Sequence, residues 1–190
     1  MSDVQQKWDC RWQEKAAAGK WQPDPWLQRV LPFLHRGQAL DVACGMGRNA
    51  IYLAEQGFEV TAIDISQVAL ELLEKEAQRR RLSIETLQVD LETEAQLPIG
   101  PFDLLLNFFY LHRPILSQEL SRVRPGGIMV VRTFSCAGTD QFGAIRPEIA
   151  LQPGELLEIF SGWTVLLHEE GLEPSAKGGS LAGIVAQRPK

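Results

Sequence analysis

Three acidic residues stand where runs of β-forming residues end, and their side chains are well placed to hold a polar ligand. Asp41 lies near the end of one such run, while Asp64 and Asp90 each directly follow another. A carboxylate attracts positive charge and accepts hydrogen bonds from hydroxyl and amino groups. The spacing therefore predicts a ligand that carries donors and positive charge.

The residues after Asp41 form a glycine-bearing turn, Asp41-Val-Ala-Cys-Gly45-Met-Gly47-Arg-Asn. Two glycines two positions apart let the backbone turn sharply and come close to a ligand. Asp64 lies 19 residues after Gly45, where an acidic side chain can accept both hydroxyls of a ribose. Taken alone, this pattern fits a nicotinamide dinucleotide almost equally well.

The charge of Asp41 distinguishes a dinucleotide from a positively charged ligand. A carboxylate beside the glycine loop repels a pyrophosphate, at a cost of about 1 kcal/mol or more near the surface. S-adenosylmethionine instead presents an ammonium and a sulfonium, which Asp41 attracts directly or through water. Asp41 can alternatively accept hydrogen bonds from the loop amides alone, and that role is compatible with ligand binding.

Later strand ends add candidates for binding and catalysis. Asp90 can accept from an adenine amine, or it can be a turn aspartate. Phe108 opens an aromatic stretch that suits a substrate wall, although core packing explains such rings equally. His112 is the candidate general base and Tyr110 a pocket-lining residue, and the alternative for His112 is a core or capping role.

Two arginines complete the substrate candidates. Arg113 and Arg132 are able to bind an anionic group on the substrate. Arg132 can alternatively pair with a nearby carboxylate.

Strand and helix patterns alternate along the chain. We expect strands over 38–43, 58–63, 84–89, 102–106 and 128–134, helices over 48–56, 67–81, from 114 onward and over 153–160, and a closing hairpin over 164–169 and 181–187. This order predicts an α/β, doubly wound, mostly parallel sheet with right-handed crossovers, which binds ligands at the carboxyl ends of its strands.

Residues 1–36 form a distinct segment before the main domain, 37–190, and hold four of the five tryptophans. Trp8 and Trp12 are four residues apart, which places them on one face of a short helix. The segment is either a lid that shapes the substrate pocket or a helical piece packed on the sheet edge.

Composition narrows the class of protein. The chain has 190 residues and a net charge of −5, which disfavours nucleic-acid partners. No signal peptide and no apolar run of about 20 residues is visible, so we expect a cytoplasmic protein without a membrane span. The three cysteines and three histidines are scattered, which predicts neither a disulfide scaffold nor a metal site.

The run ALDVACGMGRNAIYLAEQGFEVTAIDIS resembles the first two motifs of class I S-adenosylmethionine-dependent methyltransferases. Within that family, D-x-x-C-G-x-G-R-N resembles the tellurite-resistance TehB-like branch, which is similar to thiopurine methyltransferases. The segments VDLE, FDLLLNFFYLHR and RPGGIMVVRTF agree in order, so the resemblance covers residues 38–134.

The resemblance implies a Rossmann-like, seven-stranded sheet of order 3-2-1-4-5-7-6 with an antiparallel last strand. It implies S-adenosyl-L-methionine as cofactor, S-adenosyl-L-homocysteine as product, and these cofactor contacts: Asp41, Ala43, Gly45, Gly47, Arg48, Asn49, Asp64, Ile65, Asp90, Leu91 and Asn107. Trp8, Trp12, Phe108, Arg113 and Arg132 are the candidates for contact with substrate.

The sequence departs from some relatives of this kind. The motif N/D-P-P-Y/F, typical of amino-methylating enzymes of nucleic acids and proteins, is absent after strand four. The segment Glu169–Glu173 is acidic, which disfavours an oxyanion substrate.

We therefore expect methyl transfer to a small-molecule thiol, chalcogen, amine or hydroxyl. The alternatives are a methyltransferase acting on protein or RNA, a non-catalytic cofactor-binding protein, and a nicotinamide-dependent oxidoreductase. The sequence leaves the methyl acceptor and the oligomeric state open.

Overall fold

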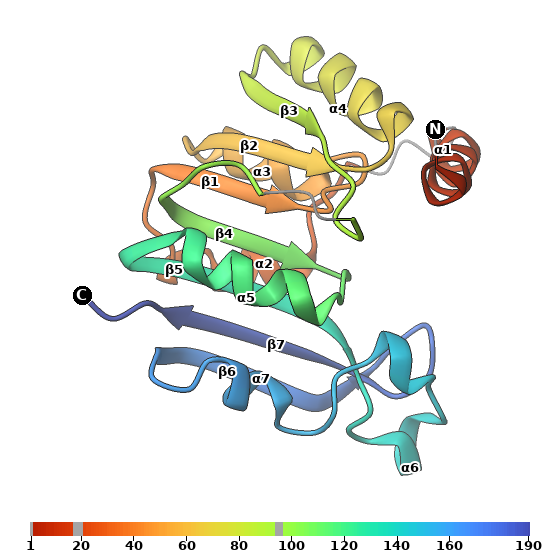
Figure 1. The fold of residues 1–190 in the computed structure, drawn as a ribbon, viewed down its shortest axis with the longest axis vertical. Helices are drawn as coiled ribbons and strands as arrows, with labels where there is room; N and C mark the ends of the chain where they lie inside the picture. Colours follow the sequence, from red (N-terminus) through yellow and green to blue (C-terminus); the bar gives the residue numbers. More distant parts are fainter. Residues whose placement is uncertain (1, 17–20, 94–96) are drawn as a thin grey trace.

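A computed structural model describes residues 2–16, 21–93 and 97–190 of the chain. These residues form one seven-stranded sheet of order β3-β2-β1-β4-β5-β7-β6, with helices on both faces (Figure 1). The β1–β2, β1–β4, β2–β3 and β4–β5 pairs are parallel, whereas β7 is antiparallel to both β5 and β6. The predicted fold class and strand order are confirmed.

The strands are β1 Gln38–Val42, β2 Glu59–Asp64, β3 Ile84–Gln88, β4 Phe102–Phe108, β5 Val123–Ser135, β6 Thr164–Pro174 and β7 Ser180–Gln187. The α-helices are α1 Asp3–Ala16, α2 Pro25–Val30, α3 Arg48–Glu55, α4 Gln67–Arg80, α5 Arg113–Arg122, α6 Thr139–Phe142 and α7 Glu155–Ile159. Two 3-10 helices, η1 Leu31–Phe33 and η2 Pro147–Ile149, complete the description.

Several boundaries differ from the prediction, and tertiary pairing explains the differences. β5 starts at Val123, five residues before the strand expected over 128–134, because Val123 pairs with Phe102 before a register shift. β6 continues past Glu169 to Pro174, since Glu170 and Pro174 still pair with β7. Sequence periodicity does not reveal such partners.

Alternating residues of the central strands face two apolar layers. Leu104 and Leu106 of β4 face the layer that α2, α3 and α4 cover. Leu105 faces the layer that α5 and α7 cover. Both faces are therefore buried, as the unbroken apolar run of β4 predicts.

Local signals at the helix ends are confirmed. Ser66 caps α4, and its hydroxyl accepts a 3.2 Å hydrogen bond from the Ala69 amide. Gly57, with φ of 88°, follows α3 in the left-handed conformation. Hydrogen bonds from Arg79 and Arg80 hold the pKa of Glu76 down to about 2. The basic end of α4 thus has carboxylate partners, and its cations lie where they complement the helix dipole.

The tryptophan-rich N-terminal segment divides between two places. α1 lies near the start of α4, beyond the carboxyl ends of β2 and β3 (Figure 1). α2 packs into the core, where Trp26 is buried and its indole donates a 2.8 Å hydrogen bond to Glu169. Residues 17–20, which the predicted segment also includes, lie outside the described residues.

Candidate functional site

The glycine loop joins β1 to α3 through alternating left-handed residues. Ala43, Gly45 and Gly47 have φ values of 53°, 57° and 76°. A Cβ atom at Gly47 would lie 2.4 Å from Leu73 Cδ1, so a larger residue would displace α4. The Cys44 amide donates a 3.0 Å hydrogen bond to the Ile63 carbonyl. The loop is thereby fixed to the end of β2.

Asp64 ties the second strand end to this loop. The Gly45 amide donates to its Oδ2 at 2.8 Å, and the Ser66 amide donates to its Oδ1 at 2.9 Å. Burial raises the pKa of Asp64, and these backbone hydrogen bonds oppose the rise. Each carboxylate oxygen has a further lone pair, so Asp64 can still accept ribose hydroxyls.

Asp41 is the most unusual group of the site. It is buried, and its Oδ2 has no hydrogen-bond partner in the described part of the chain. Burial and the charge of Asp64 raise its pKa to about 7, while a hydrogen bond with the Ala50 backbone and the charge of Arg48 oppose the rise. A buried carboxylate without a full set of partners is costly. It fits a ligand that supplies an ammonium group and donated hydrogen bonds.

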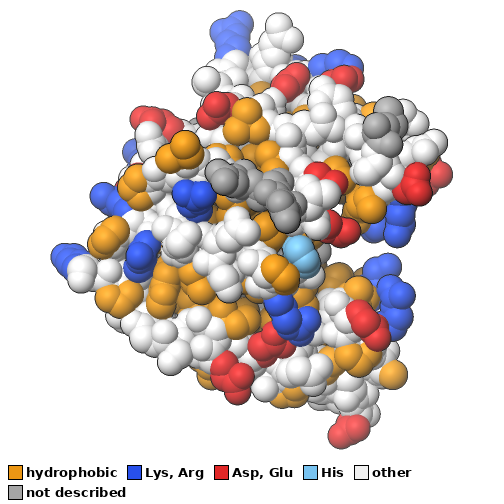
Figure 2. Space-filling view, viewed as in Figure 1, with side chains coloured by type: hydrophobic (Ala, Val, Ile, Leu, Met, Phe, Trp, Pro, Cys, Tyr) orange, Lys and Arg blue, Asp and Glu red, His pale blue; other side chains and the backbone are white. Residues whose placement is uncertain are grey.

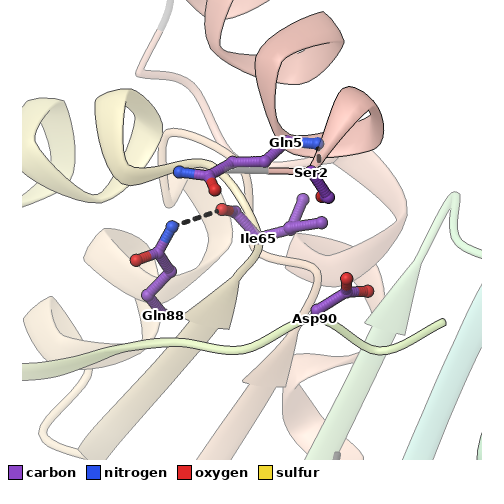
Figure 3. A pocket seen from close by; sticks show the side chains of 5 residues that line it. All are labelled: Ser2, Gln5, Ile65, Gln88 and Asp90. Carbon is purple, nitrogen blue, oxygen red and sulfur yellow. Dashed lines mark hydrogen bonds between the residues drawn. The ribbon is translucent and has the colours of Figure 1, made fainter. Parts of the chain in front are cut away.

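A cavity of about 260 Å³ lies beside these strand ends and is lined by Ser2, Gln5, Ile65, Gln88 and Asp90 (Figure 3). Gln88 donates a 2.9 Å hydrogen bond to the Ile65 carbonyl, which leaves the Ile65 side chain beside the cavity. The structure thus brings together Ile65 and Asp90, the two side chains expected to contact an adenine. Asp90 also accepts from the Glu92 amide at 3.0 Å, as a turn aspartate does.

α1 contacts both the glycine loop and the start of α4. The Ser66 hydroxyl donates to Asp9 Oδ1 at 2.6 Å, and the Val68 amide donates to the same oxygen at 3.3 Å. A Cβ atom at Gly45 would lie 2.6 Å from the Trp12 ring. The Trp8 and Trp12 rings stack with centroids 6.4 Å apart. Asp9 was missed by sequence reasoning, since only the docked helix reveals its partners.

Arg48 and Asn49 hold the N-terminal segment against the sheet. Arg48 Nη2 lies 3.0 Å from Asp24 Oδ2, and the Asp24 amide donates to Asn49 Oδ1 at 2.9 Å. Both side chains were expected to contact cofactor, and the structure places them against Asp24. Arg48 and Asn49 thus pack on the N-terminal segment, and a contact of either with cofactor stays a prediction.

The two arginines expected to bind substrate also have carboxylate partners. Arg132 is buried, pairs with Glu173, and has its Nε 3.5 Å from Asp24 Oδ1. Arg113 forms two hydrogen bonds to Glu155, at 2.6 and 2.9 Å, which join α5 to α7. For Arg132, the structure thus shows the pairing that the sequence left open.

The acidic segment of β6 is neutralised by its neighbours. Arg29 and Trp26 donate to Glu169, Arg132 pairs with Glu173, and Glu170 accepts from Ser135 and Gly154. Each of these three glutamates thus has a partner within the fold, and the expectation that the segment disfavours an oxyanion substrate stays a prediction.

An aromatic cluster follows β4. Phe108 is 8% exposed and packs on Trp26 in the core, at 6.3 Å between centroids. Phe109 is 36% exposed, with its ring 5.5 Å from Phe134 and 5.9 Å from the Arg48 guanidinium. Its φ of 61° is strained for a residue other than glycine, at about 1–3 kcal/mol. The sequence placed Phe109 in the aromatic stretch after β4 but could not predict its left-handed conformation, because that depends on the surrounding fold.

Tyr110 and His112 follow β4 and lie near the segment after β3, with ring centroids 6.3 Å apart. His112 Nδ1 lies 3.1 Å from the Leu91 carbonyl oxygen, and the Leu91 side chain is buried in the core. Burial and the charge of Glu92 raise the pKa of Tyr110. Asn107 is buried, and its amide nitrogen donates to Glu119.

The described residues contain no helix long and apolar enough to cross a membrane. Within the same ranges, no group of three His, Cys, Asp or Glu side chains is arranged to hold a metal ion.

Comparisons with known proteins find similarity to methyltransferases. Residues 39–127 match the family model described as a methyltransferase domain. YqeM of Bacillus subtilis, described as a methyltransferase, is 45% identical over 119 residues, which are 58% of this chain and 47% of that protein. Glycine N-methyltransferase of Rattus norvegicus is 32% identical over 126 residues, covering 56% of this chain and 43% of the relative.

TehB of Haemophilus influenzae is similar in both sequence and fold. Its sequence, described as an S-adenosyl-L-methionine-dependent methyltransferase, is 24% identical over 143 residues, covering 71% of this chain and 49% of TehB. Its crystal structure superposes with a TM-score of 0.73 at 20% identity, covering 87% of this chain and 62% of the TehB chain. The chain spans about half the length of the curated relatives that it matches.

The strand order, the glycine loop with its carboxylates and these matches together show that the chain resembles class I S-adenosylmethionine-dependent methyltransferases, with a methyltransferase domain over residues 39–127 and a fold similar to that of TehB.

Proposed function

We propose that the protein transfers the methyl group of S-adenosyl-L-methionine to a small-molecule nucleophile. The observation that carries the proposal is the buried carboxylate of Asp41, whose Oδ2 has no partner in the described chain. Asp41 lies near the end of β1, directly before the glycine loop that Asp64 fixes. A positively charged donor supplies the missing partner, whereas a pyrophosphate places negative charge beside two carboxylates.

In this proposal, residues at different strand ends bind different parts of the cofactor. Asp41 and Asn107 face the methionine part, Asp64 accepts from the ribose hydroxyls, and Ile65 and Asp90 flank the adenine. The cavity beside Ile65 and Asp90 supports the last assignment. In the same proposal the backbone of Ala43, Gly45 and Gly47 comes close to the ligand, because their left-handed conformations let the loop turn sharply.

The bound cofactor supplies a methyl group on a sulfonium leaving group. The protein must align the acceptor with the methyl–sulfur bond and exclude water, and such positioning is worth up to about 7–11 kcal/mol. A thiolate or a selenium anion needs no base. An amine or hydroxyl does, and we assign this role to His112, with Tyr110 lining the pocket. If Nδ1 donates to the Leu91 carbonyl, Nε2 is left to accept the proton.

α1 is the lid of this site in our proposal. Trp12 lies against Gly45, and Ser2 and Gln5 line the cavity that we assign to adenine. The cavity of about 260 Å³ is smaller than the roughly 300–1,000 Å³ of common ligand pockets. The cofactor therefore enters as α1 moves outward and Trp12 leaves the glycine loop.

A small acceptor fits the surface better than nucleic acid. Lys and Arg side chains are interspersed with Asp and Glu on the face shown in Figure 2 and do not form one continuous positive surface. Arg48, Arg113 and Arg132 all pair with carboxylates. The match to glycine N-methyltransferase supports a small acceptor, and we assign Phe109 and Phe134 to the wall that faces it.

The test is a screen for S-adenosyl-L-homocysteine formation from S-adenosyl-L-methionine with thiols, halides, chalcogen oxyanions and small amines. Turnover of one class identifies the acceptor. Turnover of only protein or RNA, or cofactor binding without any turnover, replaces the proposal with one of its alternatives. Repeating the screen with His112→Ala separates the two kinds of acceptor, because loss of a base slows an amine more than a thiol. Equal losses of turnover with amines and thiols would show that His112 has a structural role and is not the base.

A further inference from the structure

Glu119 of α5 is a fully buried carboxyl group with few partners. Its exposed fraction is 0%, and it lies on the helix face that carries the buried Ile115 and Leu116. Its oxygens accept from Asn107 Nδ2 at 3.0 and 3.1 Å, and no cation pairs with Glu119 in the described chain. Burial raises its pKa to about 7, and the Asn107 hydrogen bond only partly offsets the rise. An apolar residue of similar size would avoid this cost.

The partner of Glu119 lies at the centre of the proposed cofactor site. Asn107 is paired with Val42 of β1 on one side and with Val131 of β5 on the other. Val42 is the last residue of β1, directly before the glycine loop. Asn107 is therefore at the carboxyl edge of the sheet, beside the part of the loop that we assign to the methionine end.

Glu119 decides which way the Asn107 carboxamide points. An ionised carboxylate only accepts hydrogen bonds, so it binds the amide nitrogen and repels the amide oxygen. The Asn107 Oδ1 atom is then held away from Glu119, and it has no hydrogen-bond partner within the described residues. A buried carbonyl oxygen without a donor is costly unless a ligand or water supplies one.

We infer that Glu119 is a positioning residue, which orients the Asn107 carboxamide so that its Oδ1 accepts a hydrogen bond from the methionine ammonium of the methyl donor. The inference rests on the proposed function. It gives a role to a carboxyl group that neither the predicted site nor the methyl-transfer chemistry uses, and it links α5 to the affinity for the amino-acid end of the cofactor.

The test compares two ligands that differ in that end. S-adenosyl-L-homocysteine carries the ammonium group, whereas 5′-methylthioadenosine has the same adenosine and thioether but no amino-acid part. Calorimetry measures both with the wild-type protein, Glu119→Gln, Asn107→Ala and the double variant. Glu76→Gln is a matched control, since Glu76 is also a buried glutamate of a helix but pairs with Arg79 and Arg80.

We expect Glu119→Gln and Asn107→Ala each to weaken the binding of S-adenosyl-L-homocysteine about tenfold. This is the effect of losing one hydrogen bond to a charged group. The double variant loses no more than either single one, because both remove the same contact. Affinity for 5′-methylthioadenosine stays unchanged throughout, and Glu76→Gln binds both ligands normally.

Three results overturn the inference: normal S-adenosyl-L-homocysteine binding by Glu119→Gln, equal losses for both ligands, or losses that add in the double variant. If Glu119→Gln does not fold, Asn107→Ala decides alone, since equal effects on the two ligands exclude a contact with the ammonium. Failure of the wild-type protein to bind either ligand contradicts the proposed function itself and is thereby distinguished.

Discussion

The Gly45 amide donates a 2.8 Å hydrogen bond to Asp64 Oδ2. This contact joins the glycine loop after β1 to the end of β2, so one carboxylate both shapes the loop and faces the ligand space. The 19-residue spacing between the two residues spans α3, β2 and their short connections, which bring the two residues together. A change at Asp64 should therefore affect the loop and the cofactor together.

Asp64→Ala should weaken the binding of S-adenosyl-L-homocysteine by about 1–3 kcal/mol, since buried ribose hydroxyls lose their acceptor. Calorimetry measures the loss. Asp103→Ala is the control: Asp103 also accepts a 2.8 Å hydrogen bond from a backbone amide, that of Gln38, but at the start of β4. Unchanged affinity in Asp64→Ala would show that the ribose assignment is wrong.

Asp41 should make cofactor affinity depend on pH. Its pKa of about 7, raised by burial and by Asp64, means that the unliganded protein holds a proton there below neutrality. A cationic donor binds the ionised form, so affinity rises with pH through about 7 and then levels off, with proton release on binding. Calorimetry in two buffers of different ionisation enthalpy measures that proton.

Asp41→Asn should flatten this pH profile, and an unaltered profile in that variant would assign the titration to another group. The same shift acts oppositely on stability. The folded state holds the proton more tightly than the unfolded chain, so the contribution to the free energy of unfolding is present below the ordinary value of 3.8 and is lost as pH rises through about 7.

Phe109 should show a separation of stability from activity. Both Phe109→Gly and Phe109→Ala remove the ring, but only glycine relieves the strain of φ at 61°. The glycine variant should therefore be more stable than the alanine variant by about 1 kcal/mol, measured by denaturant unfolding. Both should lose methyl-transfer activity, and an alanine variant as stable as the glycine one would contradict the strain argument.

Trp12 should report cofactor binding by fluorescence. Its ring lies against Gly45, so the donor must displace it. Wild-type protein should change its tryptophan emission on binding S-adenosyl-L-homocysteine, and Trp12→Phe should lose most of that change. Trp163→Phe is the control, since Trp163 packs on Phe160 in the apolar layer that α5 and α7 cover, and the proposal gives it no contact with the donor. A full change in Trp12→Phe would place the moving tryptophan elsewhere.

Features that depend on neighbouring residues or on known motifs could be predicted from the sequence. The cap at Ser66 and the left-handed Gly57 follow from residue type and position, and the strand order follows from the resemblance to class I methyltransferases. The contacts of Asp9, Arg132 and Glu119 could not, because each depends on a partner from another element of the fold. The aromatic cluster shows the same limit, since Phe108 and Phe109 are neighbours in sequence but only Phe109 is exposed.

The most direct test of the cofactor assignment is calorimetric titration of the wild-type protein with S-adenosyl-L-homocysteine and, separately, with NADH. The electrostatics of Asp41 and Asp64 predict saturable binding of the first ligand and none of the second. Tight NADH binding without S-adenosyl-L-homocysteine binding would contradict a site made for a positively charged methyl donor.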